Sequence, residues 1–595
     1  MNIADLRFTE CAYFYRLKDG ITLSDSDIRK MLREVTSSKP HNYLFDIFRD
    51  KGGNGTRFSL RVFKSRNTKP SFFDKAVIGW DEQRIGYYLF VECDNYVAVL
   101  KRYATIPKDI SEKLEGIEYS SLMALEINKD SVFKKLSIQN LDGSDYAMRN
   151  KTYESLDLSK NISTIGVSRY YVKSVKGENG DDKFALTLNA SRINEFDSDL
   201  TVRDVCGWIR KKVDEIRKLT GTPDSLLSAF AQPESYSTIY KTLKPKSLLV
   251  FYGLIESLLE DDNVEFYHKN ASGASSLIDK NCFKYYLRLI SKAFVIVHED
   301  GGRYYVGDND EIEIQLQKSC IKLINKTWRN IIIQGSKAAQ YDGDLQNLIN
   351  YNHQFNVYFT DPEIVYGNRT LFRDKRLLSS IPNLIRLLKE MSQLENLDYE
   401  KHGHQTSVGL TQWDVKSVFY VIEQKFVSEY DYFICDDYEN EWADHIGISS
   451  DKVSFFVSKH KKSHDSASDF QDVVGQALKN LGNLTPTKAQ LDAKAKSWGG
   501  LYLKSSIPRF RSSSGSVKDA IDTWYNNIMN PNFQREMCLV VDFMSKDDFE
   551  KQLWNIYKKV PVKNESELCQ RLWILSTFVN SCLEYGVKPV IYCKK

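Results

Sequence analysis

In the last third of the chain, short apolar runs alternate with segments whose apolar residues recur every three or four positions. The apolar runs predict strands at Tyr430–Cys435, Glu441–Ile448, Val453–Lys459, Met537–Phe543 and Pro589–Cys593. The helical spacing predicts helices at Thr411–Phe426, Ser468–Leu481 and Leu568–Tyr585. A meander of three strands, followed by strands that alternate with helices, is typical of a mixed sheet covered by helices. We therefore expect an α/β domain with a mixed sheet over residues 411–595.

The first part of the chain, residues 1–220, has the short β-prone runs of a strand-rich domain. Tyr87–Glu92 and Tyr96–Arg102 flank a turn-prone Asp-Asn pair and predict a hairpin. Ser163–Val175 and Phe184–Leu188 flank a turn rich in glycine and aspartate, and they predict a second hairpin. Thr201–Leu219 has apolar residues at helical spacing and predicts an amphipathic helix. The pattern indicates a β-rich α+β domain of unknown role.

Residues 221–349 have a pattern that looks mostly helical. Leu248–Leu259 and Phe283–Val297 are the clearest predicted helices. Arg303–Val306 and Glu311–Ile314 form a β-like pair that resembles the wing of a winged-helix unit, although an ordinary hairpin in a linker domain fits the same residues. Residues 350–410 are expected to connect this region to the last domain. The whole chain is therefore predicted to be an α+β multidomain protein.

Composition places the chain among globular proteins and excludes several classes of function. Of its 595 residues, 42% are hydrophobic and 27% are charged, and the net charge is +3. A chain of this length is expected to form about three or four domains. No apolar run approaches the ~18 residues of a membrane helix and no secretory signal is recognisable, so we expect a cytoplasmic protein without a membrane partner. The ten cysteines form no C-x-x-C pair, and no P-loop motif of an ATPase is present.

Candidate chemistry gathers on the predicted strands of the last domain. Asp444 lies in the second of these strands, and Lys459 ends the third. Glu441 precedes Asp444 by three positions, and Glu423 on the preceding helix is a further candidate carboxylate. Carboxylates at neighbouring strand ends suit a Mg²⁺ ion, and a nearby lysine suits the positioning of water and the stabilisation of charge on a phosphate. Gln476, on the next helix, is a candidate for contact with the phosphate or the attacking water.

Basic residues flank this candidate site. Lys461 and Lys462 directly follow the third strand, and a serine-containing loop carries Lys504, Arg509 and Arg511. Such loops suit contacts with the phosphates of nucleic acid. A solvated charged surface is the alternative interpretation of both runs, just as a structural ion pair is the alternative for Asp444 and Lys459. We therefore keep DNA binding by these five residues as a hypothesis.

Three separated blocks of the last domain resemble a nuclease module. They are Asp436-Asp-Tyr-Glu-Asn-Glu-Trp-Ala-Asp-His-Ile446, Ser454-Phe-Phe-Val-Ser-Lys459 and Asp469-Phe-Gln-Asp-Val-Val-Gly-Gln-Ala-Leu-Lys479. Their order and content resemble a module at the C-terminal end of some large bacterial helicase-like proteins. The resemblance covers about residues 350–595 and implies the PD-(D/E)xK fold, which is the restriction-endonuclease-like α/β fold.

The resemblance also implies a function. Proteins of this kind look like components of bacterial anti-phage defence, so the expected activity is Mg²⁺-dependent cleavage of DNA. Asp444 and Glu441 would hold the metal, Lys459 would position water, and Gln476 would support the phosphate. The expected partners are DNA, a separate helicase, ATPase or other defence subunit, and a trigger encoded by the phage.

One position departs from the family pattern. The fold usually places an acidic residue two positions before the lysine, where this chain has Val457. Either Glu441 or Glu423 substitutes for the missing ligand, or the domain no longer cleaves. The second hypothesis is therefore a catalytically inactive module that binds nucleic acid as a sensor or scaffold subunit of a defence complex.

Overall fold

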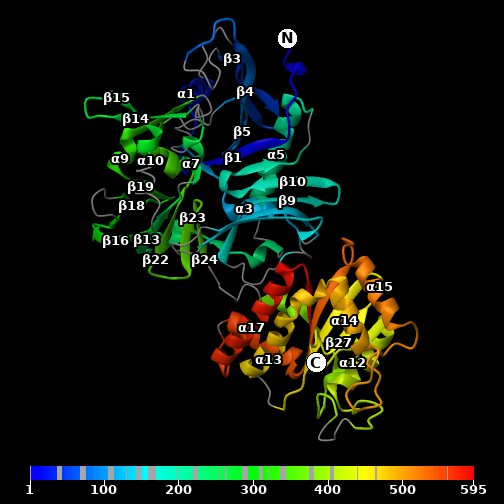
Figure 1. Cartoon of the computed structure of the whole chain (residues 1–595). Coiled ribbons are helices and arrows are strands. Elements are labelled where there is room, and N and C mark those ends of the chain that lie inside the picture. The colour runs from blue at the N-terminus through cyan, green and yellow to red at the C-terminus, as the bar shows by residue number, and fades with distance from the viewer. Residues whose placement is uncertain are drawn as a thin grey trace. The chain divides into compact units, whose positions relative to one another are not determined.

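The computed structural model describes most of the chain, and it confirms an α+β protein with several sheets. The described residues are 2–36, 43–67, 75–104, 113–128, 130–141, 149–158, 162, 169–196, 199–218, 226–251, 253–261, 264–283, 293–306, 312–318, 320–335, 343–373, 381–402, 408–438, 440–462, 466–558 and 560–595. The chain divides into two compact units. Unit 1 is Met1–Ser159 with Arg169–Asp374, and unit 2 is Lys160–Ser168 with Lys375–Lys595 (Figure 1).

A large antiparallel sheet forms the first part of unit 1. Its strands follow the order β2-β3-β4-β5-β1-β11-β10-β9-β7-β8, with β6 paired to β1. They are β1 (Cys11–Leu17), β2 (Tyr43–Gly53), β3 (Thr56–Asn67), β4 (Glu82–Cys93), β5 (Tyr96–Arg102), β6 (Leu114–Gly116), β7 (Val132–Asn140), β8 (Asn150–Glu154), β9 (Tyr170–Asn179), β10 (Asp182–Thr187) and β11 (Arg192–Asn194). The helices of this part are α1 (Asp25–Thr36), α3 (Tyr119–Glu126) and α5 (Val202–Lys218).

The sequence patterns of this region are confirmed where the residues are described. The first predicted hairpin is the pair β4 and β5, and the second is the pair β9 and β10. Residues 163–168 of the second prediction lie outside the described residues. The amphipathic helix is α5, whose buried face includes Val205, Ile209 and Val213 at helical spacing.

Two further sheets complete unit 1. One follows the order β12-β24-β23-β22-β13-β16-β17-β18-β19, and the other follows β15-β14-β20-β21. Their strands are β12 (Gln232–Glu234), β13 (Pro245–Val250), β14 (Val264–Lys269), β15 (Ser275–Ile278), β16 (Ala293–Asp300), β17 (Arg303–Val306), β18 (Ile312–Leu316), β19 (Ile321–Ile324), β20 (Ile331–Gly335), β21 (Gly343–Asp344), β22 (Phe355–Phe359), β23 (Ile364–Gly367) and β24 (Thr370–Arg373). The helices between them are α6 (Tyr236–Ile239), α7 (Gly253–Leu259), α9 (Lys326–Asn330) and α10 (Leu345–Tyr351).

The prediction of a mostly helical middle region is therefore wrong for the described residues. The predicted helix Leu248–Leu259 is the end of β13 followed by α7, and the end of the predicted helix Phe283–Val297 lies in β16. Residues 284–292 lie outside the described residues. A short apolar run fits a buried strand as well as a buried helix, and pairing of β13 with β16 and β22 decides for the strand. The predicted pair near Arg303 is confirmed as β17 and β18, which belong to the larger sheet.

A six-stranded mixed sheet forms the centre of unit 2. Its order is β25-β30-β29-β28-β27-β26. The strands are β25 (Leu388–Glu390), β26 (Tyr432–Cys435), β27 (His445–Ile448), β28 (Lys452–Lys459), β29 (Gln534–Ser545) and β30 (Lys588–Lys594). Strands β26, β27 and β28 form the predicted antiparallel meander, while β29 runs parallel to both β28 and β30.

Helices cover both faces of this sheet. They are α11 (Ile381–Leu387), α12 (Val418–Phe426), α13 (Ala467–Lys479), α14 (Lys488–Trp498), α15 (Val517–Asn527), α16 (Lys546–Tyr557) and α17 (Glu565–Glu584). One face packs against α12 through a core that contains Ile422, Phe456 and Val540. The other face packs against the remaining helices, with α13 and α17 in contact with each other (Figure 1).

Two boundaries in unit 2 differ from the sequence prediction. The helix expected from Thr411 begins only at Val418, because the Ser417 side chain caps it by accepting from the N–H of Tyr420. Strand β27 begins at His445, so Glu441 and Asp444 lie in the loop before it rather than in the strand. Among the described residues, every helix is too short or too polar to cross a lipid bilayer.

Candidate metal centre

The loop that joins β26 to β27 brings the candidate carboxylates together. Its backbone continues the ladder of the sheet, since the N–H of Asp436 donates to the Asp444 carbonyl at 2.9 Å. The N–H of Asp444 donates in turn to the Phe456 carbonyl of β28 at 3.0 Å. Tyr438 and Asn440 have positive φ angles, 77° and 48°, which let the chain reverse direction between these two ends. Both ends of the loop are thus fixed to the sheet.

Asp436 attaches this loop to α14 and does not belong to the group of carboxylates that could hold a metal ion. Its side chain is buried, and both carboxylate oxygens lie 2.7 Å from Nζ of Lys494 on α14. It also accepts from the indole N–H of Trp498 at 2.7 Å and from the N–H of Trp442 at 2.9 Å. Lys494 donates further to the Asn440 carbonyl at 2.8 Å. The carboxylate is therefore saturated with donors, and one lysine joins the beginning of the loop to its middle.

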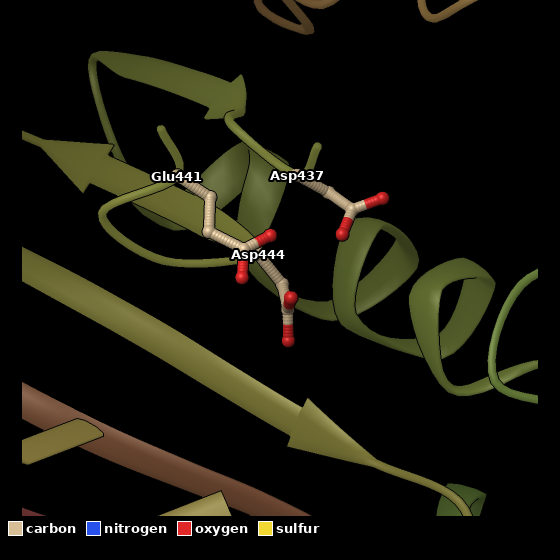
Figure 2. Close-up of side chains that lie close together, drawn as sticks. All are labelled: Asp437, Glu441 and Asp444. Carbon is tan, nitrogen blue, oxygen red and sulfur yellow. The ribbon is translucent and has the colours of Figure 1, made fainter. Parts of the chain in front are cut away.

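Asp437, Glu441 and Asp444 form the carboxylate group of the site. Each offers an oxygen within 4.8 Å of those of the other two (Figure 2). Asp437 and Asp444 are buried, and Glu441 is partly exposed. The structure thus brings the predicted residues Glu441 and Asp444 together, and it adds Asp437.

Asp444 is the most enclosed of the three. Its Oδ2 accepts from the N–H of Ser458 at 2.6 Å and from the Ser458 hydroxyl at 2.8 Å. Burial, followed by the neighbouring charge of Asp437, raises the pKa of Asp444 to about 8. The carboxyl group is therefore largely protonated near neutral pH until a cation compensates its charge.

Asp437 is held by groups from two other segments. Nζ of Lys401 donates to its carboxylate at 2.8 Å, and the Tyr502 hydroxyl donates to it at 2.9 Å. Burial opposes the charge on Lys401, but the carboxylates of Asp437 and Asp444 outweigh burial and raise the pKa of this lysine. Lys401 is thus a permanent positive charge beside the carboxylate group.

Glu441 is oriented by the helix α13. Its Oε1 accepts from the Gln476 amide at 3.0 Å, and its Oε2 accepts from the N–H of Tyr438 at 3.2 Å. Lys479, one turn further along the helix, lies 3.9 Å from Oε1 and is mostly exposed. Gln476 therefore contacts a candidate metal ligand, whereas the sequence predicted contact with the phosphate or with the attacking water.

Lys459 lies at the end of β28 and forms an ion pair with Glu400 at 3.2 Å. Glu400 also lies 3.9 Å from Lys401, and its charge contributes to the raised pKa of Asp444. Lys459 is therefore connected to the carboxylate group through Glu400. Val457 is fully buried in the core between the sheet and α13. The position two residues before Lys459 therefore carries no carboxylate.

Glu423 lies in a different cluster from the carboxylate group. Its oxygens accept from the Trp413 indole at 2.7 Å and from Arg511 at 2.7 Å, and His445 lies 3.3 Å away. Burial alone would raise the pKa of Glu423, but His445 and Arg511 outweigh burial and lower it. These partners already use both oxygens, so nothing in the structure supports the metal-ligand role expected for Glu423.

The five predicted DNA contacts have different surroundings. Arg509 is buried against Tyr502, and Arg511 is paired with Glu423. Lys461 forms ion pairs with Asp472 and Asp469 of α13 at 2.9 and 3.5 Å. Lys462 and Lys504 are exposed. Within the described part of unit 2, these two exposed lysines are the members of the predicted set best placed to meet a phosphate.

The donor set fits a divalent cation that prefers oxygen ligands. Three carboxylates from one loop match the hard ligands that Mg²⁺ and Mn²⁺ bind, and no sulfur or imidazole belongs to the group. Burial, followed by the charge of Asp437, raises the pKa of Asp444, and the charge of Lys401 offsets this rise only in part. Asp437, Glu441 and Asp444 would hold the ion.

Substitution of Asp444 by asparagine is expected to stabilise unit 2 when EDTA removes divalent cations. The folded pKa of Asp444 lies above its unfolded value, so the folded state binds the proton more tightly and loses stability as pH rises from about 4 to about 8. Asparagine keeps the shape but cannot ionise. At about pH 8 the variant should exceed the wild type by at least about 1.4 kcal/mol, the free energy of one pKa unit.

The matched control for this measurement is Asp472→Asn, at an exposed position of α13. Chemical denaturation at several pH values should show a gain for Asp444→Asn that grows with pH and no such trend for the control. A gain independent of pH would contradict the assignment of a raised pKa to this carboxyl group.

Sequence reasoning missed Asp437, Lys401 and Glu400. Asp437 was treated as part of a loop, although two aspartates directly after a strand were a usable signal. Lys401 and Glu400 lie in a segment expected only to connect domains, and no local pattern distinguishes them.

Comparison with known protein families finds no family model that matches the chain, and comparison with curated proteins finds no protein that matches it.

Proposed function

We propose that unit 2 is a metal-dependent phosphodiester hydrolase that cleaves DNA, with a restriction-endonuclease-like fold. The observation that carries this proposal is the carboxylate group, whose ligand oxygens lie within 4.8 Å of one another on a loop between two sheet strands. The order helix, three-stranded meander, helix and parallel strand supports the fold assignment. A fold of this kind hosts many functions, so the site and not the fold carries the activity.

Each residue of the site has a chemical task in this proposal. A bound Mg²⁺ ion would supply Lewis acidity toward the phosphate oxygens. Glu441 is kept in place by Gln476, and Asp444 is kept in place by Ser458. Lys401 offsets the negative charge of Asp437 before substrate arrives. In hydrolysis, the water oxygen forms a bond to phosphorus and the water releases a proton. The bond from phosphorus to the leaving oxygen breaks, and the leaving oxygen takes up a proton.

Lys459 remains the candidate for positioning the attacking water. Lys459 is the last residue of β28 and directly follows Ser458. The hydroxyl of Ser458 donates to Asp444. The side chain of Lys459 is 30% exposed, and its ammonium group forms an ion pair with Glu400 rather than with a candidate metal ligand. It can therefore donate to a water molecule or to a phosphate oxygen without leaving a metal ligand uncompensated.

A second candidate function is a binding module that does not cleave. Val457 is buried where the family pattern has a carboxylate, and Lys401 already occupies one side of Asp437. Such a domain would serve as a nucleic-acid sensor or as the scaffold subunit of a defence complex. Its signature is strong salt dependence of DNA binding without any strand breakage.

Incubation of the whole protein with supercoiled plasmid DNA tests the two candidates. We expect nicking or linearisation with Mg²⁺ or Mn²⁺ and none with EDTA. Lys459→Ala should slow cleavage by about 100-fold or more, as the loss of a charge-stabilising donor does. Lys425→Ala, at an exposed position of α12 paired with Glu429, is the control and should leave the rate unchanged. Salt-sensitive binding of DNA without cleavage in either metal would decide for the binding module.

The cellular role that we propose is defence of a bacterium against phage. It rests on the resemblance of the three sequence blocks, and the expected partners are a separate helicase or ATPase and a trigger from the phage. Plating efficiency of phage on cells that carry the wild type or Lys459→Ala distinguishes the candidates. Loss of protection in the variant supports a nuclease, whereas full protection supports the scaffold.

A further inference from the structure

The ammonium group of Lys401 lies where a cation lies when it binds both oxygens of one carboxylate. Its Nζ is 2.8 Å from Oδ1 and 2.8 Å from Oδ2 of Asp437. Asp437 is one of the three residues of the carboxylate group (Figure 2). The chain therefore supplies one cation of this group from its own side chains.

The segment that carries Lys401 is fixed to the beginning of α12. The N–H groups of Val418 and Phe419 donate to the carbonyls of Tyr399 and Glu400, each at 3.1 Å. These bonds satisfy two of the donors that a helix leaves open at its N-terminus. Nζ of Lys401 also lies 5.1 Å from the centre of the Phe419 ring, and the lysine side chain is only 25% exposed. The ammonium group is thus held in place from both its backbone and its side chain.

The other charges close to the carboxylate group are balanced or exposed. Glu400 forms an ion pair with Lys459 at 3.2 Å, so these two charges offset each other. Lys479 lies 3.9 Å from Glu441, but it is 62% exposed, and water and salt screen its charge. Among the described residues, Lys401 is therefore the cation with the strongest effect on the group.

The charge of the group fits one divalent ion. When ionised, the three carboxylates carry three negative charges, and Lys401 offsets one of them. One divalent cation balances the remaining two. A second divalent ion would give an excess of positive charge, and it would be repelled by the ammonium group, because the ions of a two-metal site lie only about 3.5–4 Å apart.

We propose that Lys401 takes the second cation position of the carboxylate group, so that the centre binds one divalent ion and not two. The proposal deepens the proposed function and rests on the carboxylate group as a metal site. Among the described residues, Lys401 alone donates to Oδ1 of Asp437, so this oxygen keeps a lone pair for the ion. Lys401 is then a residue that sets both the number of metal ions and the affinity for the first one.

Equilibrium dialysis of the whole protein against Mn²⁺ alone tests the proposal. The decisive variant is Lys401→Gln, whose amide is uncharged and one bond shorter but still a hydrogen-bond donor. We expect the wild type to bind one Mn²⁺ ion that is lost in Asp444→Asn. The Lys401→Gln variant should bind this ion at least ten times more tightly, because no ammonium group repels it, and it should bind a second ion.

Two further variants are matched controls. Lys401→Arg keeps the charge beside Asp437 and should still bind a single ion. Lys479→Gln removes a charge that also lies near the carboxylate group but is exposed, and it should change the Mn²⁺ affinity by less than about threefold. Melting temperatures measured with Mn²⁺ show that each variant is folded.

Electron paramagnetic resonance at saturating Mn²⁺ separates one ion from two at the same centre, because two Mn²⁺ ions about 4 Å apart couple magnetically. We expect the spectrum of an isolated ion from the wild type and from Lys401→Arg. The spectrum of a coupled pair is expected from Lys401→Gln. A coupled pair in the wild type, or a Lys401→Gln variant that binds Mn²⁺ no more tightly than the wild type, overturns the proposal.

This proposal and the nuclease proposal fail separately. A wild type that cleaves DNA but holds a coupled pair of ions contradicts the role of Lys401 alone. A wild type that binds one Mn²⁺ ion, and gains a second on Lys401→Gln, contradicts the nuclease alone if it cleaves no DNA with Mg²⁺ or Mn²⁺. Absence of Mn²⁺ binding at the carboxylate group contradicts both.

Discussion

Replacing Asp437 by asparagine is expected to slow Mg²⁺-dependent DNA cleavage by about 1,000-fold or more. The substitution removes one of three carboxylates that would hold the ion, and loss of several kcal/mol of transition-state stabilisation by a metal corresponds to a factor of this size. An asparagine oxygen at the position of Oδ2 can still accept from Lys401 at 2.8 Å and from Tyr502 at 2.9 Å, and the melting temperature of the variant checks that the fold is kept. Initial rates of plasmid cleavage, measured at saturating Mg²⁺, give the comparison.

Asp472→Asn is the matched control for this substitution. It makes the same chemical change at an exposed position of α13, outside the carboxylate group. Its cleavage rate should equal that of the wild type, and its melting temperature should rise with Mg²⁺ as the wild type's does. If Asp437→Asn and Asp444→Asn both cleave at the wild-type rate, the carboxylate group is not the active site.

Replacing Lys494 by methionine is expected to lower the free energy of unfolding of unit 2 by about 3–5 kcal/mol, the usual effect of removing one partner from a buried ion pair. Lys494 is the charge that compensates the buried Asp436, and it also holds the Asn440 carbonyl. Burial raises the pKa of Asp436 even with the lysine present. Without it, the folded state must bind a proton at Asp436, so the loss of stability should grow as pH rises.

Chemical denaturation at about pH 5 and at about pH 8 measures this effect. Lys496→Met, an exposed position two residues further along α14, is the control and should change stability by less than about 0.5 kcal/mol. The double variant Lys494→Met with Asp436→Asn should recover part of the loss, because no charge is then left buried. An equal loss in the two lysine variants would contradict the role of the buried pair.

Long, strongly patterned elements could be predicted from the sequence. The helix α5, the meander of β26, β27 and β28, and the final helix and strand were all recognisable, because each repeats one spacing over its whole length. The middle region could not be predicted in the same way. Leu248–Val250 is a short run with no flanking signal that separates a strand from a helix, and its pairing partner β22 lies about a hundred positions further along the chain.

The site was predicted to the extent that its residues lie in recognisable sequence blocks. Glu441 and Asp444 were found in one block and Gln476 in another, and the structure brings all three together. Lys401 and Glu400 could not be found, because only the folded chain places them beside the loop. Glu423 was assigned to the site only because it lies on the helix before the meander. The side chains that it contacts, Trp413 and Arg511, come from a loop before this helix and from a loop after it in the chain.

The loop between β26 and β27 has a consequence for the order in which the site is made during translation. All three carboxylates are synthesised before Lys494, which lies 58 residues after Asp436 and joins the two parts of their loop. A nascent chain on the ribosome can therefore expose the aspartates and the glutamate while the loop still lacks its anchor. The loop can reach its final conformation only after α14 has emerged and docked, so synthesis of the three carboxylates and assembly of the carboxylate group are separate events.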